Sequence, residues 1–188
     1  MGQKQVPLKI LDVIHSFINE HLETKKKELA GIAALRCGFE KWMQLEFVIW
    51  AMGEYELNPR HDRDDDTDGI GLEHTTVINK LPRHWKTVDV WLHARGEGTY
   101  YIEMKSMVEG WNMEKQISSW VEDFRILNNI RKDYYPHGVA SILFGSQGDS
   151  DRWTKESWKE FVNERIKTSG LQPSCEVIGS IGIAILCK

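Results

Sequence analysis

Two neighbouring segments with strict alternation of apolar and polar residues constrain the fold of this chain most. Residues 87–93 place Val88, Val90 and Leu92 on one face, and residues 99–105 have an apolar face of their own. The linking segment ARGEG is short and contains two glycines, which is typical of a β-hairpin. The sequence therefore predicts an antiparallel strand pair with one buried face.

Hydrophobic periodicity predicts the elements around this hairpin. Apolar residues at helical spacing indicate helices over residues 8–29, 32–52, 113–130 and 153–166. Short apolar runs indicate strands over residues 74–79, 138–145 and 179–187, and the Asp- and Gly-rich residues 56–74 are expected to form a loop. The order α-α-β-β-β-α-β-α-β favours an α/β fold, with a central mixed β-sheet flanked by helices on both faces.

Length and composition limit the class of protein. The chain has 188 residues, which fits a single domain over residues 1–188. Its longest apolar run is far below the roughly 20 residues of a membrane span, and no signal peptide is expected. The three cysteines lack metal-ligand spacing, so we expect reduced thiols in a cytoplasmic protein. The short apolar runs predict that it has no membrane partner. The net charge of -4 argues against binding polyanions over the whole surface but allows a local basic cleft.

Charged side chains lie on the polar faces of the two predicted strands. Alternation places Asp89 on one of these faces, and Glu103 and Lys105 on the other. In a hairpin the two carboxylates would converge, and they would repel each other unless a cation binds between them. Hard oxygen ligands favour Mg²⁺ or Mn²⁺, and a lysine beside them can act on an attacking water. The alternative is a cross-strand ladder of salt bridges on a solvated sheet face.

The second predicted helix contributes another acid. Helical spacing predicts an apolar arc with Glu46 near its middle, made of Phe39, Trp42, Met43, Ile49 and Trp50. The same spacing places Glu40, Lys41 and Gln44 away from that arc. A glutamate that faces a core needs a paired group or a cation. We therefore expect Glu46 to meet the strand carboxylates; the alternative is a glutamate that reaches the rim of the core.

Together these residues resemble the PD-(D/E)xK nuclease superfamily, which has the restriction-endonuclease-like fold. The motif consists here of Asp89, thirteen further residues, and then Glu103, Met104 and Lys105, preceded by an acid on an early helix. The predicted elements between residues 31 and 145 also follow that family's α-β-β-β-α-β core order. An N-terminal helix would precede this core, and an α-β extension would follow it.

The resemblance implies a metal-dependent nuclease. Mg²⁺ or Mn²⁺ would be held by Asp89 and Glu103, Glu46 would complete or support this set of ligands, and the carbonyl of Met104 would also face the metal. The implied reaction is hydrolysis of phosphodiester bonds in nucleic acid, with DNA favoured over RNA. A homodimer would allow a small nuclease to cut both strands of a duplex.

Two further residues receive roles from the same resemblance. Lys105 would act on the attacking water, and Gln116, eleven residues later on the next predicted helix, would orient the substrate or Lys105. The alternative function is a non-catalytic nuclease-fold binding module in a defence or repair assembly. The intact set of Asp89, Glu103 and Lys105 favours the enzyme.

Basic and aromatic residues near the predicted site are candidates for contacts with a nucleic acid. Phosphates would be bound by Arg60, Arg63, Arg83, His84, Lys86, Arg131 and Lys132, with Trp85 and Trp91 available for stacking. The acidic residues 62–68 fit the start of a calcium loop at Asp64, Asp66 and Asp68, but its twelfth position is Thr75. A solvated acidic loop is therefore favoured there. His93 shares the predicted face of Asp89.

Overall fold

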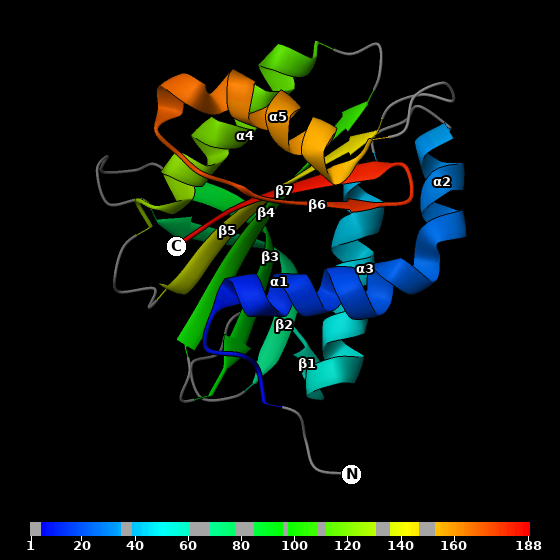
Figure 1. Ribbon diagram of the computed structural model, residues 1–188. Helices are drawn as coiled ribbons and strands as arrows, with labels where there is room; N and C mark the ends of the chain where they lie inside the picture. Colours follow the sequence, from blue (N-terminus) through cyan, green and yellow to red (C-terminus); the bar gives the residue numbers. More distant parts are fainter. Residues whose placement is uncertain are drawn as a thin grey trace.

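Seven β-strands form one sheet within the described residues (Figure 1). This computed structural model describes residues 5–34, 39–60, 68–77, 85–95, 98–108, 112–130, 136–146 and 153–188. The strands are β1 (Asn58–Pro59), β2 (Gly69–Val77), β3 (Trp85–Ala94), β4 (Gly98–Val108), β5 (Pro136–Ser146), β6 (Ser174–Ile178) and β7 (Ile181–Cys187). Their order is β1-β2-β3-β4-β5-β7-β6; the pairs β1–β2 and β4–β5 are parallel, and the other neighbours are antiparallel. The predicted α/β fold with a central mixed sheet is confirmed.

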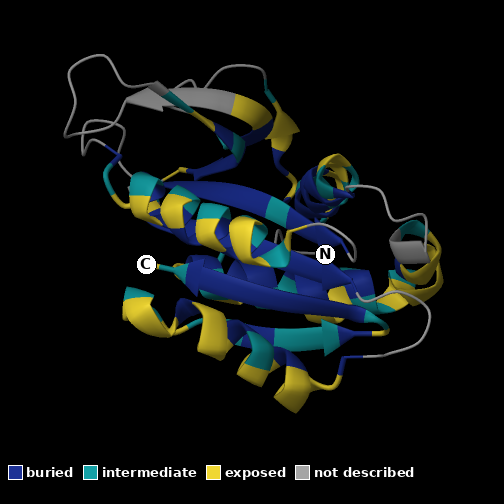
Figure 2. Ribbon diagram, turned by 90° about the horizontal axis from the view of Figure 1, so that it is seen from above, coloured by how far each residue is buried: buried dark blue, intermediate teal, exposed yellow. Residues whose placement is uncertain are grey.

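Helices cover both faces of this sheet (Figures 1 and 2). They are α1 (Ile10–Ser16), a π-helical turn (Phe17–His21), a 3₁₀ turn (Leu22–Lys25), α2 (Lys26–Ala34), α3 (Glu40–Tyr55), α4 (Met113–Leu127), α5 (Lys155–Ile166) and a final 3₁₀ turn (Lys167–Ser169). Residues of α1 and α3 share one buried cluster with the sheet, and residues of α4 and α5 share the other. In the described part of the chain, no helix is long and apolar enough to cross a membrane.

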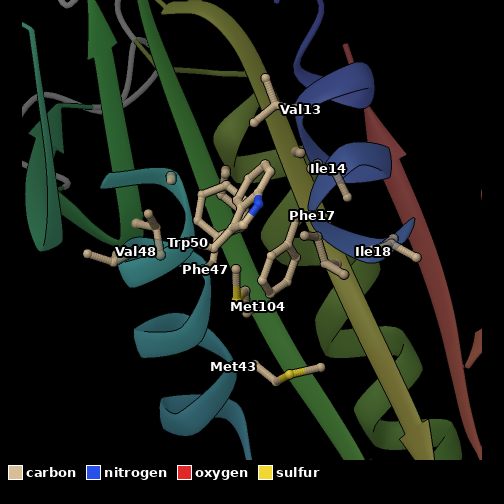
Figure 3. Packing of buried hydrophobic residues seen from close by; sticks show 14 of the residues in the cluster. Val13, Ile14, Phe17, Ile18, Met43, Phe47, Val48, Trp50 and Met104 are labelled. Atoms are coloured by element: carbon tan, nitrogen blue, oxygen red, sulfur yellow. The ribbon is translucent and has the colours of Figure 1, made fainter. Parts of the chain in front are cut away.

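The α1–α3 face of the sheet is packed with aromatic side chains (Figure 3). Phe17, which follows α1, contacts Phe47 of α3 edge-on, with ring centroids 5.0 Å apart, and lies 5.4 Å from the Trp50 ring. Met104 of β4 is fully buried in the same cluster. Because β4 lies in the middle of the sheet, this packing fixes α3 over the strand that carries the candidate site residues.

On the opposite face, two glycines make room for a tryptophan of α5. Gly145 of β5 and Gly182 of β7 are register partners. A Cβ atom at Gly145 would lie 2.5 Å from the Trp158 ring, and one at Gly182 would lie 2.3 Å from it. Trp158 is itself fully buried. The absence of side chains at this glycine pair therefore lets α5 approach the sheet closely.

Several predicted boundaries were wrong. The first helix does not run uninterrupted over residues 8–29: α1 gives way to the π-helical turn, and α2 continues past Gly31 to Ala34. The predicted loop 56–74 includes the first residues of β2, which begins at Gly69. Short strand β6 was not predicted. Glycine is tolerated inside α2 and β2 because helix propensity and strand propensity are weak compared with tertiary packing.

We expect Gly182→Ala to lower the free energy of unfolding by about 1 to 3 kcal/mol, because the added methyl group overpacks the Trp158 site. Urea unfolding followed by circular dichroism measures this change. Gly53→Ala is the matched control: Gly53 lies inside α3 with open space around its Cα, so this change should stabilise the protein by about 0.5 to 1 kcal/mol. Equal effects of the two substitutions would contradict the close approach of Trp158.

Candidate functional site

The candidate site forms where β3 and β4 separate. Their backbone pairing runs from the hairpin end to the pair Val90–Ile102. Beyond that pair, the N–H group of Met104 donates instead to Oδ2 of Asp89, at 2.8 Å. The N–H group of Ser106, two residues further along the same strand, donates to Oε2 of Glu40 at 3.4 Å. Two carboxylates therefore occupy the side of β4 that β3 leaves, and they satisfy backbone donors that would otherwise lack a partner.

The alternation predicted for residues 87–93 is interrupted at this point. Val90 belongs to the cluster on the α1–α3 face, as predicted, but Val88 belongs to the cluster on the α4–α5 face. Val88 was therefore wrongly assigned to the face of Val90. The neighbouring strand is also irregular here: Glu73 of β2, between the register pairs Leu72–Val90 and His74–Val88, has a left-handed backbone with φ 55°. This break in regular pairing lets the Asp89 carboxylate turn toward the β4 backbone.

Glu103 and Lys105 point toward α4 and form a chain of alternating charges there. Nζ of Lys86, on β3, lies 2.7 Å from Oε1 of Glu103 and 3.2 Å from Oδ1 of Asp123. The other oxygen of Asp123, Oδ2, lies 3.0 Å from Nζ of Lys105. Lys105 also donates weakly to Oγ of Ser119, at 3.5 Å. All four charged side chains are mostly buried, with exposed fractions of 8% to 21%.

Helix α4 supplies Asp123, the negative charge that pairs with Lys86 and Lys105. It begins at an N-cap, where the Asn112 side chain accepts a hydrogen bond from the Lys115 N–H at 3.0 Å. Asp123 lies four residues after Ser119 and seven after Gln116, so the three share one helical row. The contacts with Lys105 involve Ser119 and Asp123, while Gln116 is half-buried nearer the start of the helix. Asp123 was not predicted as a site residue from the sequence.

The structure places Glu46 elsewhere. Oε2 of Glu46 lies 2.7 Å from Nε2 of His21, and Oε1 lies 3.7 Å from Nζ of Lys25. Both partners come from the helical turns that follow α1. The acid of α3 that approaches the strand carboxylates is instead Glu40, whose pKa is affected by the charges of Asp89 and Lys105.

The error lay in the predicted orientation of α3. Ile49, expected in the core, is 54% exposed, and Gln44, expected outside, is fully buried. The buried row runs through Met43, Phe47 and Ala51, which lie three, seven and eleven residues after Glu40. That spacing would have identified Glu40 as the acid on the sheet-facing side.

Burial raises the pKa of the Glu40, Asp89 and Glu103 carboxyl groups. For Glu40 and Asp89 the first cause is burial; the Asp89 charge raises the pKa of Glu40 further, and the Met104 N–H partly opposes the shift of Asp89. Burial and then the Asp89 charge raise the pKa of Glu103 to about 7, although the Lys86 ammonium opposes this. The carboxylates therefore lie in an environment that favours either protons or a bound cation.

The two lysines keep their charges. Burial alone would lower the pKa of Lys86, but the carboxylates of Glu103 and Asp123 outweigh burial and raise it. The pKa of Lys105 is raised in the same way, with Asp123 as its strongest partner. Both side chains are therefore ammonium ions at neutral pH.

The oxygen donors fit a hard divalent cation. Oε2 of Glu103 is buried and has no hydrogen-bond partner among the described residues, and Asp89 and Glu40 present further carboxylate oxygens nearby. Carboxylate oxygens suit Mg²⁺ or Mn²⁺. Within the described ranges, no three His, Cys, Asp or Glu side chains already lie at metal-ligand spacing. Metal binding would therefore require side-chain rotation, and Glu103 would have to release Lys86.

The remaining predicted residues are dispersed. Lys86 is 19% exposed and belongs to the ion-pair chain, and Trp91 is fully buried, so the prediction that Trp91 stacks on a ligand was wrong. Nδ1 of His93 lies 2.9 Å from Oγ1 of Thr99. Asp68 accepts a hydrogen bond from the Arg95 N–H. Outside the described residues lie Arg63, Asp64, Asp66, Arg83, His84, Arg131 and Lys132, and the side chain of Trp85 is also not described.

Comparisons of the chain with protein-family models, with curated proteins and with solved structures found no match. The chemistry of the site is therefore inferred from its geometry and charges. Those features are the separation of β3 from β4, the three carboxyl groups with raised pKa, and the lysines held by Asp123.

The raised pKa of Glu103 predicts a pH-dependent stability. Between about pH 4.5 and 7 the folded protein binds more protons at Glu103 than the unfolded chain does, so stability falls as pH rises. In EDTA, the free energy of unfolding of Glu103→Gln relative to wild type should rise by roughly 2 kcal/mol between pH 5 and 8. Urea unfolding at several pH values measures this difference.

The exposed Glu122 of α4 provides the control for this pH series. Its side chain is 61% exposed, and Glu122→Gln reports any general effect of removing an acid from this helix. Parallel profiles for wild type and Glu103→Gln would contradict the raised pKa of Glu103.

Proposed function

We propose that this protein is a metal-dependent nuclease of the PD-(D/E)xK type that hydrolyses phosphodiester bonds, with DNA as its substrate. The observation that carries the proposal is the gathering of Asp89, Glu103 and Lys105 where β3 leaves β4. Glu40 of α3 approaches the same point from the other side of the sheet. A ladder of salt bridges on a solvated surface would not need carboxyl groups that are buried and mutually destabilised.

The order of elements also supports the proposal. Helix α3, strands β2, β3 and β4, helix α4 and strand β5 follow one another as α-β-β-β-α-β. Strands β4 and β5 are parallel, with α4 as the connection between them. This arrangement agrees with the restriction-endonuclease-like core, with α1 and α2 before it and α5, β6 and β7 after it.

The proposed reaction is attack of water on phosphorus, which breaks the bond to one ester oxygen; that oxygen then takes a proton. A bound Mg²⁺ or Mn²⁺ supplies positive charge that polarises the phosphate and favours the attack. Asp89 and Glu103 would hold it, Glu40 takes the role first expected of Glu46, and the carbonyl of Met104 is a further oxygen of the same strand. These side chains must be deprotonated to do so.

Lys105 contributes a fixed positive charge. Its ammonium group would donate a hydrogen bond to the attacking water or to the phosphate oxygens as negative charge develops on them. Gln116, on the same row of α4 as Asp123, would orient the substrate. The half-buried position of Gln116 leaves part of its side chain accessible for this role.

A second candidate function has one observation in its favour. Lys86 neutralises Glu103, and Lys41 pairs with Glu73 near Asp89, so the chain supplies cations of its own to the acidic site. A non-catalytic binding module of the same fold would use these pairs structurally. We favour the enzyme because Glu103 Oε2 is buried and accepts no hydrogen bond from any residue that the structure describes.

The test is an assay with plasmid, linear and single-stranded DNA and with RNA, in Mg²⁺, Mn²⁺ or EDTA. We expect cleavage of DNA that requires a divalent metal. Asp89→Asn, Glu103→Gln and Lys105→Met should each reduce the rate by at least about 100-fold, because each removes a group that stabilises the transition state.

Variants of two acids of α3 test which of them belongs to the site. Glu40→Gln should reduce the rate far more than Glu46→Gln, since only Glu40 approaches Asp89. The surface variant Glu122→Gln serves as the control and should cut like wild type. The proposal fails if no nucleic acid is cut with any metal, or if the Asp89 and Lys105 variants cut as well as wild type.

A further inference from the structure

We propose that Lys86 is an internal competitor of the divalent metal, and that Asp123 retains the Lys86 ammonium when a metal takes Glu103. This inference rests on the proposed function, because it concerns the same carboxylates. It assigns Lys86 a role in setting metal affinity, whereas the sequence alone suggested a contact with phosphate.

The Lys86 ammonium already binds the carboxylate that the metal would need. Its Nζ lies 2.7 Å from Oε1 of Glu103, a short charge-assisted hydrogen bond, and its side chain is 19% exposed. Lys86 comes from β3, Glu103 from β4 and Asp123 from α4, so the ammonium lies at the meeting point of three elements. A metal ion that binds Glu103 must therefore displace this ammonium or lie beside it.

Asp123 offers the displaced Lys86 ammonium a second partner. Nζ of Lys86 is already 3.2 Å from Oδ1 of Asp123, while the other oxygen of Asp123 pairs with Lys105. A shift toward Asp123 would keep Lys86 paired after Glu103 has turned away. Asp123 can thus accept both lysines without leaving a buried charge unpaired, which would be costly.

The positive charge of Lys86 should weaken the binding of a metal ion at Glu103. Two cations that share one buried carboxylate repel each other more strongly than they would in water. Removal of the Lys86 charge should therefore tighten metal binding, even though it also removes a hydrogen bond from Glu103. Because the competition is electrostatic, a substitution that keeps the charge should change the affinity little.

The experiment is a titration of the metal-free protein with Mn²⁺ and, separately, with Ca²⁺, measured by isothermal calorimetry. Lys86→Met should bind Mn²⁺ on the order of 10-fold more tightly than wild type, which corresponds to 1.4 kcal/mol. Lys86→Arg should stay close to wild type. The matched control is Lys155→Met. Lys155 of α5 pairs with Glu176 of β6 at 2.8 Å. The metal affinity of this variant should equal that of wild type.

A second variant and a second measurement distinguish a change in metal affinity from misfolding of a variant. Lys86→Gln should also tighten binding, and circular dichroism establishes whether each variant is folded. In thermal melts, added Mn²⁺ should raise the Tm of Lys86→Met more than that of wild type, because ligand that binds only the folded state stabilises it. Equal or weaker binding by the folded Lys86→Met and Lys86→Gln proteins would overturn the inference.

Asp89→Asn separates this inference from the proposed function. If Asp89→Asn abolishes Mn²⁺ binding but the Lys86 variants do not tighten it, only the competition by Lys86 is refuted. If no variant binds metal, or if Asp89→Asn binds as well as wild type, the proposed metal site fails and the inference fails with it.

Discussion

The hydrogen bond from the Met104 N–H to the Asp89 carboxylate is the interaction on which the site depends. It replaces a backbone bond at the point where β3 leaves β4, and Glu40 does the same for Ser106. Side-chain acids can thus enter the middle of a sheet without leaving buried donors unsatisfied. Acids from opposite faces of the sheet reach this part of β4: Glu40 of α3 accepts a hydrogen bond from the Ser106 N–H, and Asp123 of α4 pairs with Lys105.

The two hydrophobic clusters hold these elements at fixed positions. The ring contacts of Phe17, Phe47 and Trp50 fix α3 on one face, and the seating of Trp158 over two glycines fixes α5 on the other. Strand β4 contributes to both clusters, through Met104 and Met107 respectively. The charged residues of β4 therefore lie on a strand that is buried from both sides, which accounts for the raised pKa of Glu103.

Structure was predicted correctly from the sequence where a pattern depends on local geometry. Alternation along β4 was enough to bring Glu103 and Lys105 to one face, and the α/β class followed from the order of the elements. Prediction failed where tertiary packing decides. The orientation of α3 depends on which side chains meet the sheet, so bulky Ile49 was favoured over Ala51, and Glu46 over Glu40. Asp123 was missed because no local pattern distinguishes a helix acid that meets two lysines from one that meets solvent.

The hairpin of β6 and β7 has a consequence for the behaviour of the chain in crowded solution. Strand β5 carries Ile142, Leu143 and Phe144 in succession, an apolar stretch of the kind that templates intermolecular sheets when its edge is open. Strand β7 pairs with β5 from Ala140 to Ser146 and moves the edge outward to β6. That outer strand has five residues and carries Glu176, which binds Lys155. A short, charged edge is a poor template for aggregation, so the β6–β7 hairpin keeps the apolar strand β5 covered.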